Sequence, residues 1–324
     1  MLPPLPYDAW EPTKTTLHLW AQIVGKIELG STAHRNHWWN ITLLPSARGL
    51  RTHRMTRGGT GFDVEFDFID HRLVIRSDGA HEPAGFELRD GLSVAEFYRS
   101  IFEELRKFGI EMKILSKPYG VPMTTPFERD EEHRSYDNVM ARRFWEVLSW
   151  SAGALQTFAS RFEGKQSPVH IYWHTFDLAM SRFSGKRADT SMRPDRVQKE
   201  AYSHEVIAFG FWAGDANTPA PTYYTYTAPE PVALAQQPLL PQEAAWFEVP
   251  GGHLGGLRYD AVRTAEDPLA TLLSFYQSGY DAGVKTANWD TSGFDPLVIA
   301  PTLSSWSEAQ GALGGQSAST ALTT

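Results

Sequence analysis

The stretch Phe62-Asp63-Val64-Glu65-Phe66-Asp67-Phe68 alternates strictly between apolar and acidic side chains. Successive side chains of a β-strand point to opposite faces, so the aromatic rings and Val64 share one face and the three carboxylates share the other. The alternation predicts a half-buried strand over Phe62–Ile69, and Arg72–Arg76 is predicted to return as the second strand of a hairpin. The chain is therefore expected to contain antiparallel sheet.

A helix is predicted to follow this hairpin. Ser93-Val94-Ala95-Glu96 is a capping box, in which the Ser93 hydroxyl and the Glu96 carboxylate satisfy free backbone amides. Apolar residues then recur at helical spacing as far as Phe108. Two further helices are predicted, from about Tyr136 to Phe162 and from Asp267-Pro268 onward. Strands grouped ahead of helices, rather than alternating with them one by one, favour an α+β fold.

Two of the remaining predicted strands resemble each other. Leu17–Ile23 and Val169–Thr175 each place a histidine, an aromatic and a polar residue on one face. We therefore expect two related halves, each an antiparallel sheet with a covering helix, joined by the long Tyr136–Phe162 helix, with chance similarity of strands as the alternative. The expected divisions are 1–125, 126–300 and a mobile Ser/Gly/Ala/Thr-rich tail over 301–324. The strands predicted besides the hairpin are Thr16–Leu29, Trp38–Leu44, Val169–Leu178, His204–Trp212 and Tyr223–Thr227.

The composition excludes several classes of protein. The 324 residues include no cysteine, which rules out a disulfide scaffold, a Cys-type zinc site and a thiol nucleophile. The net charge of −8 disfavours nucleic acid and anionic lipid as partners. No stretch reaches the ~20 apolar residues of a membrane span, and Met1–Pro6 lacks the features of a signal peptide. We expect a cytoplasmic protein with a small-molecule partner.

Histidines on the predicted strands are the candidates for chemistry. His170 and His204 carry imidazoles, which titrate near neutral pH and suit proton transfer. His204 is predicted to be the general base or a ligand, Glu205 to orient it, and His170 to be the second acid or base. The same three residues would hold a metal ion if one binds, and the cofactor is left open. The structural alternative is a half-buried histidine hydrogen-bonded within a sheet.

A second group of residues is predicted to bind substrate. Arg182 suits an anionic group, or else forms a structural ion pair with Asp177. Large aromatic residues near the histidines could line a pocket for a flat ligand, or simply form core. The predicted substrate-binding residues are Arg182, Trp20, Trp39, Tyr172, Tyr224, Tyr226, His18 and His37.

These residues lie in motifs that resemble, nearly end to end, a bacterial family known as domain of unknown function 5996. The resemblance brings no activity with it. Relatives usually carry Gly where His174 stands, so the resemblance favours His170, His204 and Glu205 as the shared residues. The matching stretches include His18–Lys26, His37–Asn40, Phe66–His71, Ser167–His170, Phe176–Ala179, Arg182–Gly185, Ala201–Glu205 and Tyr226–Pro231.

Together these features predict an enzyme that acts on a small organic molecule. Its pocket, lined by histidines and aromatic rings, is expected near the junction of the two halves, where ligand sites tend to form. The chemistry would be His/Glu acid–base or metal-assisted. A binding or sensor protein without chemistry is the alternative, and a structural subunit is the third possibility. The sequence leaves the oligomeric state open.

Overall fold

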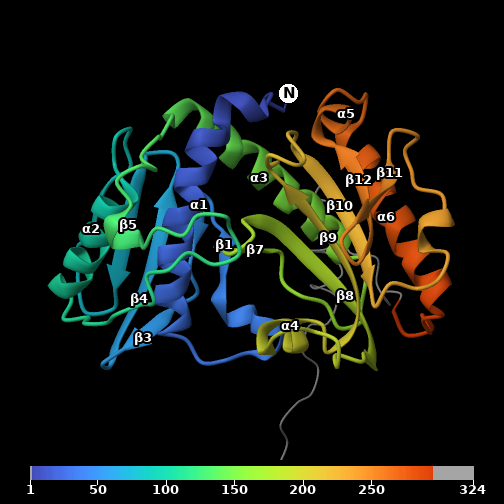
Figure 1. The fold of residues 1–324 in the computed structure, drawn as a ribbon, viewed down its shortest axis with the longest axis horizontal. Coiled ribbons are helices and arrows are strands. Elements are labelled where there is room, and N and C mark those ends of the chain that lie inside the picture. The colour runs from blue at the N-terminus through green and yellow to red at the C-terminus, as the bar shows by residue number, and fades with distance from the viewer. Residues whose placement is uncertain (1, 295–324) are drawn as a thin grey trace, which may run out of the picture.

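The computed structural model describes residues 2–294, and the predicted tail over 301–324 lies outside the described residues. Figure 1 shows the arrangement of the elements. The first part of the chain contains α1 (Tyr7–Leu29), η1 (Asn36–Ile41), β1 (Thr42–Pro45), β2 (Gly49–Arg51), β3 (Met55–Arg57), β4 (Thr60–Asp67), β5 (Arg72–Ser77), β6 (Ala84–Glu87), α2 (Val94–Lys107) and η2 (Phe127–Arg129). The second part contains α3 (Asn138–Ala159), β7 (His170–Tyr172), β8 (Asp177–Arg187), α4 (Arg196–Ala201), β9 (His204–Trp212), β10 (Thr222–Ala228), η3 (Leu234–Gln236), β11 (Ala245–Val249), β12 (Gly252–Arg258), α5 (Tyr259–Arg263) and α6 (Pro268–Ala287).

The strands of residues 2–294 form one antiparallel sheet of twelve strands, in the order β11-β12-β10-β9-β8-β7-β1-β2-β4-β5-β6, with β3 paired to β4. The pair β1–β7 joins the two parts of the chain, with Thr42 opposite Tyr172 and Leu43 opposite Ile171. A helix precedes the strands on each side of this pair, and another helix follows them. The fold is therefore α+β, with a large antiparallel sheet and several helices.

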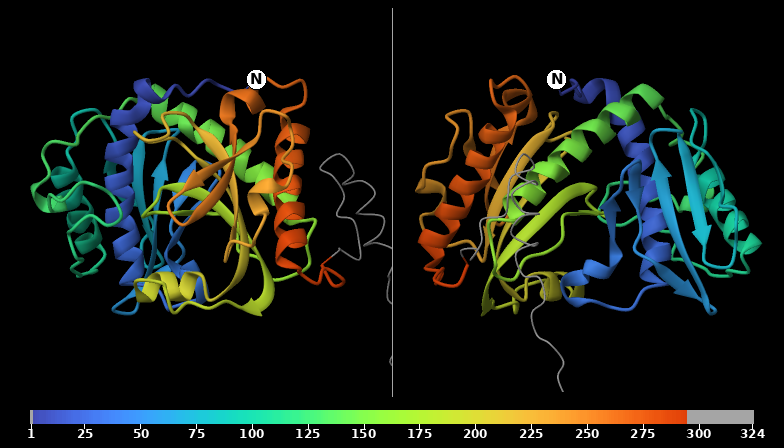
Figure 2. Two further views of the ribbon diagram at one scale, coloured as in Figure 1. Left: turned by 45° about the vertical axis from the view of Figure 1, so that its right-hand side comes forward. Right: turned by 180° about the vertical axis from the view of Figure 1, so that it is seen from behind.

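Helices cover one face of the sheet on each side of the β1–β7 pair (Figure 2). On one side Phe97 of α2 stacks on Trp20 of α1 at 5.0 Å and on Phe66 of β4 at 6.1 Å between ring centroids. On the other side Phe209 of β9 lies 4.9 Å from Phe158 of α3 and 5.7 Å from Tyr276 of α6. Burial of large aromatic rings supplies much of the apolar stabilisation that holds helix to sheet.

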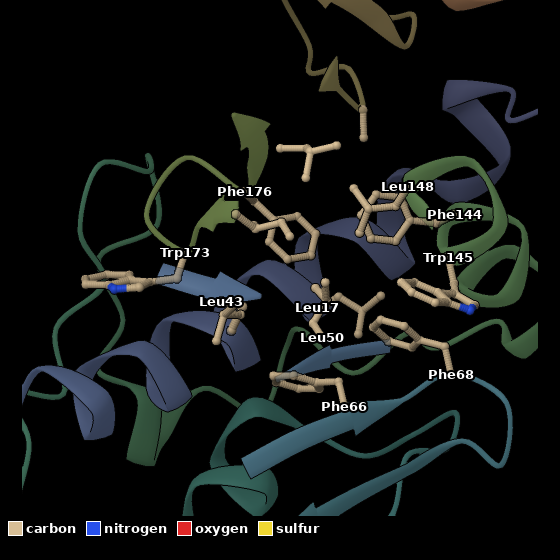
Figure 3. Packing of buried hydrophobic residues seen from close by; sticks show 14 of the residues in the cluster. Leu17, Leu43, Leu50, Phe66, Phe68, Phe144, Trp145, Leu148, Trp173 and Phe176 are labelled. Carbon is tan, nitrogen blue, oxygen red and sulfur yellow. The ribbon is translucent and has the colours of Figure 1, made fainter. Parts of the chain in front are cut away.

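One large apolar core runs through both parts of the chain, and a smaller cluster of Phe183, Val206 and Ala228 lies apart from it. Figure 3 shows Leu17 of α1 among residues of the first strands, of α3 and of the β7–β8 connection. Phe144 of α3 stacks on Phe176 at 5.6 Å, and Trp10 of α1 stacks on the other side of Phe144 at 4.7 Å. The two parts are therefore packed together by side chains as well as by the sheet.

Most of the elements with clear periodicity are confirmed. The hairpin of Phe62–Ile69 and Arg72–Arg76 corresponds to β4 and β5, and the Ser93 hydroxyl accepts a hydrogen bond from the Glu96 amide at 3.1 Å. The strand predicted over His204–Trp212 is β9. The remaining confirmed predictions are β10, α2, α3 and α6.

The strand predicted over Thr16–Leu29 is wrong, because this segment is the C-terminal part of the helix α1. Every residue from Thr16 to Gly25 is buried. This stretch is buried on all sides, its polar residues Thr16, His18 and Gln22 included, so its sequence lacks the apolar stripe of an amphipathic surface helix. The chance alternation of Leu17, Leu19 and Ala21 then led to the incorrect prediction of a strand.

Two other strand predictions are only partly right. Over Trp38–Leu44 the chain forms η1 and becomes extended only at Thr42. Over Val169–Leu178 it forms β7, a tight turn and the start of β8, with Phe176 at φ 59°. Because Leu17–Ile23 is helical, the strand-to-strand similarity with Val169–Thr175 does not exist in the structure.

We expect Gly25→Ala to destabilise the protein by about 1–3 kcal/mol, the usual cost of overpacking. A Cβ on Gly25 would lie 2.2 Å from Cγ of Trp173, so α1 and the β7–β8 connection would have to separate. Gly153→Ala in α3 is the matched control, because a Cβ there meets nothing within 4 Å. In urea unfolding Gly153→Ala should match or exceed the wild type, since alanine favours helix. Equal stability of the two variants would contradict the tight packing of α1.

Candidate functional site: a polar cavity at the end of α1

A cavity of about 500 Å³ lies where α1 ends and the chain turns towards η1. Its volume is within the range of small-molecule sites. The residues around it are polar or small, and none of them is acidic: Gly30, Ser31, Thr32, Ala33, Arg35, Asn40, His53, Arg54 and Thr56. Arg35 and Arg54 therefore give the lining a positive charge.

The walls of the cavity are fixed by hydrogen bonds between its two sides. Thr32 Oγ1 donates to the Glu28 carbonyl at 2.8 Å, and Asn40 Nδ2 donates to Thr32 Oγ1 at 3.0 Å. Across the cavity the Thr56 amide donates to the Ser31 carbonyl at 2.9 Å. The segment that follows α1 is thereby held against β3.

A carboxyl group supports the cavity from inside the protein. The Glu28 side chain is fully buried, and its Oε1 accepts hydrogen bonds from the backbone amide of His53 at 2.7 Å and from His53 Nδ1 at 3.0 Å. Burial raises the pKa of Glu28 to about 7, although the hydrogen bonds and charge of His53 oppose the rise. Glu28 Oε2 has no hydrogen-bond partner among the described residues.

The Glu28–His53 pair leaves one imidazole nitrogen for chemistry. His53 Nδ1 lies 3.0 Å from Glu28 Oε1, and a ring that donates from Nδ1 to this carboxylate keeps its lone pair on Nε2. His53 is one of the residues that line the cavity, and its Nε2 makes no hydrogen bond within residues 2–294. A carboxylate that orients an imidazole in this way is the arrangement used for general acid–base catalysis.

The junction of the sheet lies next to this pair. His170 of β7 is buried, and its Nδ1 is 3.2 Å from Thr42 Oγ1 of β1. Burial, together with the charge of His53, lowers the pKa of His170 to about 3. His170 is therefore a neutral neighbour of His53, and its Nε2 has no partner in the described part of the chain.

The structure does not bring His170 and His204 together. Ala179 of β8 is opposite both His170 of β7 and Gly210 of β9, so His170 is level with Gly210. His204 is six residues from Gly210 along β9, which corresponds to ~20 Å of strand. Glu205 accepts a hydrogen bond from Ser184 Oγ at 2.7 Å, and His204 Nδ1 is 3.1 Å from Ser203 Oγ instead.

Three of the predicted site residues, His37, His204 and Trp39, lie close together. The His37 ring lies 5.5 Å from the His204 ring and 5.2 Å from the Trp39 ring. Lys165, which the sequence did not single out, completes this group: its Nζ is 2.7 Å from His37 Nε2.

The predicted tyrosines lie on the sheet face that α3 and α6 leave free. The rings of Tyr224 and Tyr226 stack at 6.2 Å, and Tyr172 lies one strand beyond β8. The Tyr224 hydroxyl donates to the Asp177 carboxylate, so Asp177 pairs with a tyrosine rather than with Arg182. Burial raises the pKa of all three tyrosines.

Three predicted substrate-binding residues lie in the packed interior. Trp20 is fully buried against Phe97. His18 is hydrogen-bonded at 3.1 Å to the His174 carbonyl, and burial lowers its pKa to about 3. Arg182 is buried among aromatic rings on the helix side of the sheet.

No pattern in the sequence predicts the Glu28–His53 pair. Glu28 stood at the end of a segment predicted as a strand, and nothing in the spacing of Glu28 and His53 links them. The weak signal was a carboxylate in the last turn of an apolar segment, where the helix dipole disfavours negative charge.

The described residues contain neither a group of metal ligands nor a helix that could cross a membrane. No group of three or more histidine, aspartate or glutamate side chains is placed to hold a metal ion there. None of the helices in residues 2–294 combines the length and apolarity that crossing a bilayer requires.

The structure is that of an α+β protein with a polar cavity at the end of α1. Residues 2–296 match the model of a family of unknown function, DUF5996, and the chain belongs to this family. The chain is also similar to the 6-phospho-beta-glucosidase AscB of Escherichia coli (strain K12), with 30% identity over 132 residues. That match covers 39% of this chain and 25% of the relative, so the chain spans about a quarter of the relative's length. No solved structure matches the chain.

Proposed function

We propose that this protein is an enzyme that acts on a small anionic organic molecule by acid–base chemistry in the cavity at the end of α1. His53 transfers the proton through Nε2, Glu28 orients His53, and Arg35 and Arg54 hold the anionic group. The observation that carries the proposal is the bond between the buried Glu28 carboxyl and His53 Nδ1, beside a cavity whose lining includes His53.

The charge of the lining supports an anionic ligand. The Arg54 guanidinium already makes two hydrogen bonds within the protein: its Nη2 donates to Asp78 at 2.6 Å, and its Nη1 donates to Thr56 at 3.2 Å. The Arg35 side chain makes no such bond in the described residues. A guanidinium presents several donors in one plane and suits a carboxylate or a phosphate.

The relation to a glycosidase gives a second reaction class, which the cavity does not favour. Glycoside hydrolysis generally uses two carboxyl groups on opposite sides of the scissile bond. The cavity lining contains no aspartate or glutamate, and Glu28 is bonded to His53 behind it. Proton transfer by an imidazole is the chemistry that these residues support.

The test is turnover of a panel of phosphorylated and carboxylated metabolites, followed by mass spectrometry. We expect the wild type to convert at least one of them, and His53→Gln to lower that rate by about 100-fold or more, the usual contribution of a general acid or base. Arg35→Gln should raise KM, whereas Arg51→Gln should change nothing, because Arg51 is exposed and lies outside the lining. Undiminished turnover by His53→Gln would remove the proposal.

We also propose that the two parts of the chain arose by duplication. The support is the order of elements: α1, the strands β1–β6 and α2 in one part, and α3, the strands β7–β12 and α6 in the other. Outward from the β1–β7 pair, the sheet runs β2-β4-β5-β6 on one side, with β3 also paired to β4, and β8-β9-β10-β12-β11 on the other. On this correspondence α1 matches α3, so the long helix begins the second half instead of joining two halves.

A further inference from the structure

The Lys165–His37–His204 cluster lies where η1, β8 and β9 meet, apart from the cavity lining. Lys165 Nζ donates to His37 Nε2 at 2.7 Å, and His37 Nδ1 donates in turn to the Ala201 carbonyl at 3.1 Å. Because Nδ1 carries the proton, Nε2 is the basic nitrogen of the ring. The amine of Lys165 therefore faces an imidazole that is oriented to accept a proton from it.

The backbone is strained where it presents this imidazole. His37 has φ 57° and Trp38 has φ 62°, and neither residue is glycine. Left-handed conformations of ordinary residues cost about 1–3 kcal/mol each and persist where the surroundings enforce them, often at functional sites. The strain places the His37 ring between the Ala201 carbonyl and Lys165.

The surroundings of the amine are apolar and positive. Lys165 Nζ lies 4.9 Å from the centroid of the Phe183 ring and 5.8 Å from that of Trp39. The basic neighbours of Lys165 are His37 and His204, and Arg187 is close enough to lower the pKa of His204. The nearby carboxylates have other partners: Glu200 is bonded to His34, and Glu205 is bonded to Ser184. No carboxylate forms an ion pair with Lys165 within the described ranges. Burial lowers the pKa of Lys165 as well.

We propose that Lys165 is a nucleophilic amine that forms an imine with a small aldehyde or ketone, whose apolar body lies against Trp39 and Phe183. His37 Nε2 takes a proton from the Lys165 ammonium group. The free electron pair then attacks the carbonyl carbon, so that a C–N bond forms and the C=O π bond breaks, and the oxygen takes a proton from the attacking nitrogen to give a carbinolamine. The imidazolium returns its proton to the hydroxyl group, which leaves as water as the C=N bond forms.

Reductive trapping tests this inference without knowledge of the natural ligand. The folded protein is incubated with benzaldehyde and cyanoborohydride at pH 7, and the rate of labelling of each lysine is followed by peptide mass spectrometry. We expect Lys165 to be labelled faster than the exposed Lys113 and Lys117, because its lowered pKa leaves more of its amine unprotonated at pH 7 and His37 accepts the proton. Equal rates at the three lysines in the wild type would overturn the inference.

A variant separates the role of His37 from simple burial. His37→Asn keeps a residue that tolerates the left-handed backbone and removes the ring. We expect it to slow labelling of Lys165 several-fold while leaving Lys113 and Lys117 unchanged. His34→Asn is the matched control, because His34 is on the same segment but bonds to Glu200. If His37→Asn labels Lys165 as fast as the wild type does, His37 has no part in activating the amine.

Discussion

Glu28→Gln is expected to become more stable relative to the wild type as the pH rises from 5 to 8, by about 2–3 kcal/mol. The pKa of Glu28 is about 7 in the folded protein, against 4.5 as its ordinary value. A folded-state pKa above the unfolded one means that the native protein binds the extra proton between these values. This stabilisation is fully present below pH 4.5 and is lost as the pH rises through 7. Glutamine cannot ionise, so the variant lacks this loss.

Urea unfolding of both proteins at pH 5 and at pH 8 measures the effect. Glu146→Gln is the control, since Glu146 is an exposed residue paired with Arg142, and it should show no such change. His53→Gln should move the loss of stability to higher pH, because the hydrogen bonds and charge of His53 hold the pKa of Glu28 down. A difference between wild type and Glu28→Gln that is the same at both pH values would show that Glu28 is not buried as described.

Arg182→Ala is expected to cost about 3–5 kcal/mol, the range for emptying a large buried site. The guanidinium lies 3.8 Å from the Phe158 ring centroid and 4.7 Å from that of Tyr280, and its Nη2 donates to the Phe158 carbonyl at 2.6 Å. Truncation removes these contacts and leaves a void between β8 and α3.

Arg182→Met distinguishes a structural role from substrate binding. Methionine is long, flexible and uncharged, and replacing buried charges by apolar residues of similar volume is often neutral or stabilising. We expect Arg182→Met to retain most of the stability in urea unfolding and all of the turnover attributed to the cavity. A large loss of turnover in a stably folded Arg182→Met protein would return Arg182 to the list of substrate-binding residues.

Sequence-based prediction was accurate for segments with one polar face and inaccurate for segments that are buried on all sides. β4 has one face of carboxylates, which pair with arginines, and α2 has a polar face, so the period of their apolar residues was visible in the sequence. α1 is buried on all sides from Thr16 to Gly25, and the spacing of its apolar residues was therefore misleading. The pairing of β1 with β7 depends on contacts more than a hundred residues apart, which local patterns cannot encode.

The candidate sites show the same limit. His37, Trp39 and His204 were predicted as site residues and do meet, but Lys165 was missed because no motif marks it. Glu28 and His53 were missed because their bond depends on where α1 ends relative to the β2–β3 connection. Arg182 has the chemistry of a substrate ligand, and only its aromatic surroundings reveal a core position.

The most direct test of the account is the protonation state of the His53 ring, observed by ¹⁵N NMR of the imidazole at pH 8. The account predicts a neutral ring protonated at Nδ1, with the lone pair on Nε2, and loss of that preference in Glu28→Gln. A wild-type His53 protonated at Nε2 instead would mean that Glu28 does not orient the ring, and the proposed acid–base site would have no basis.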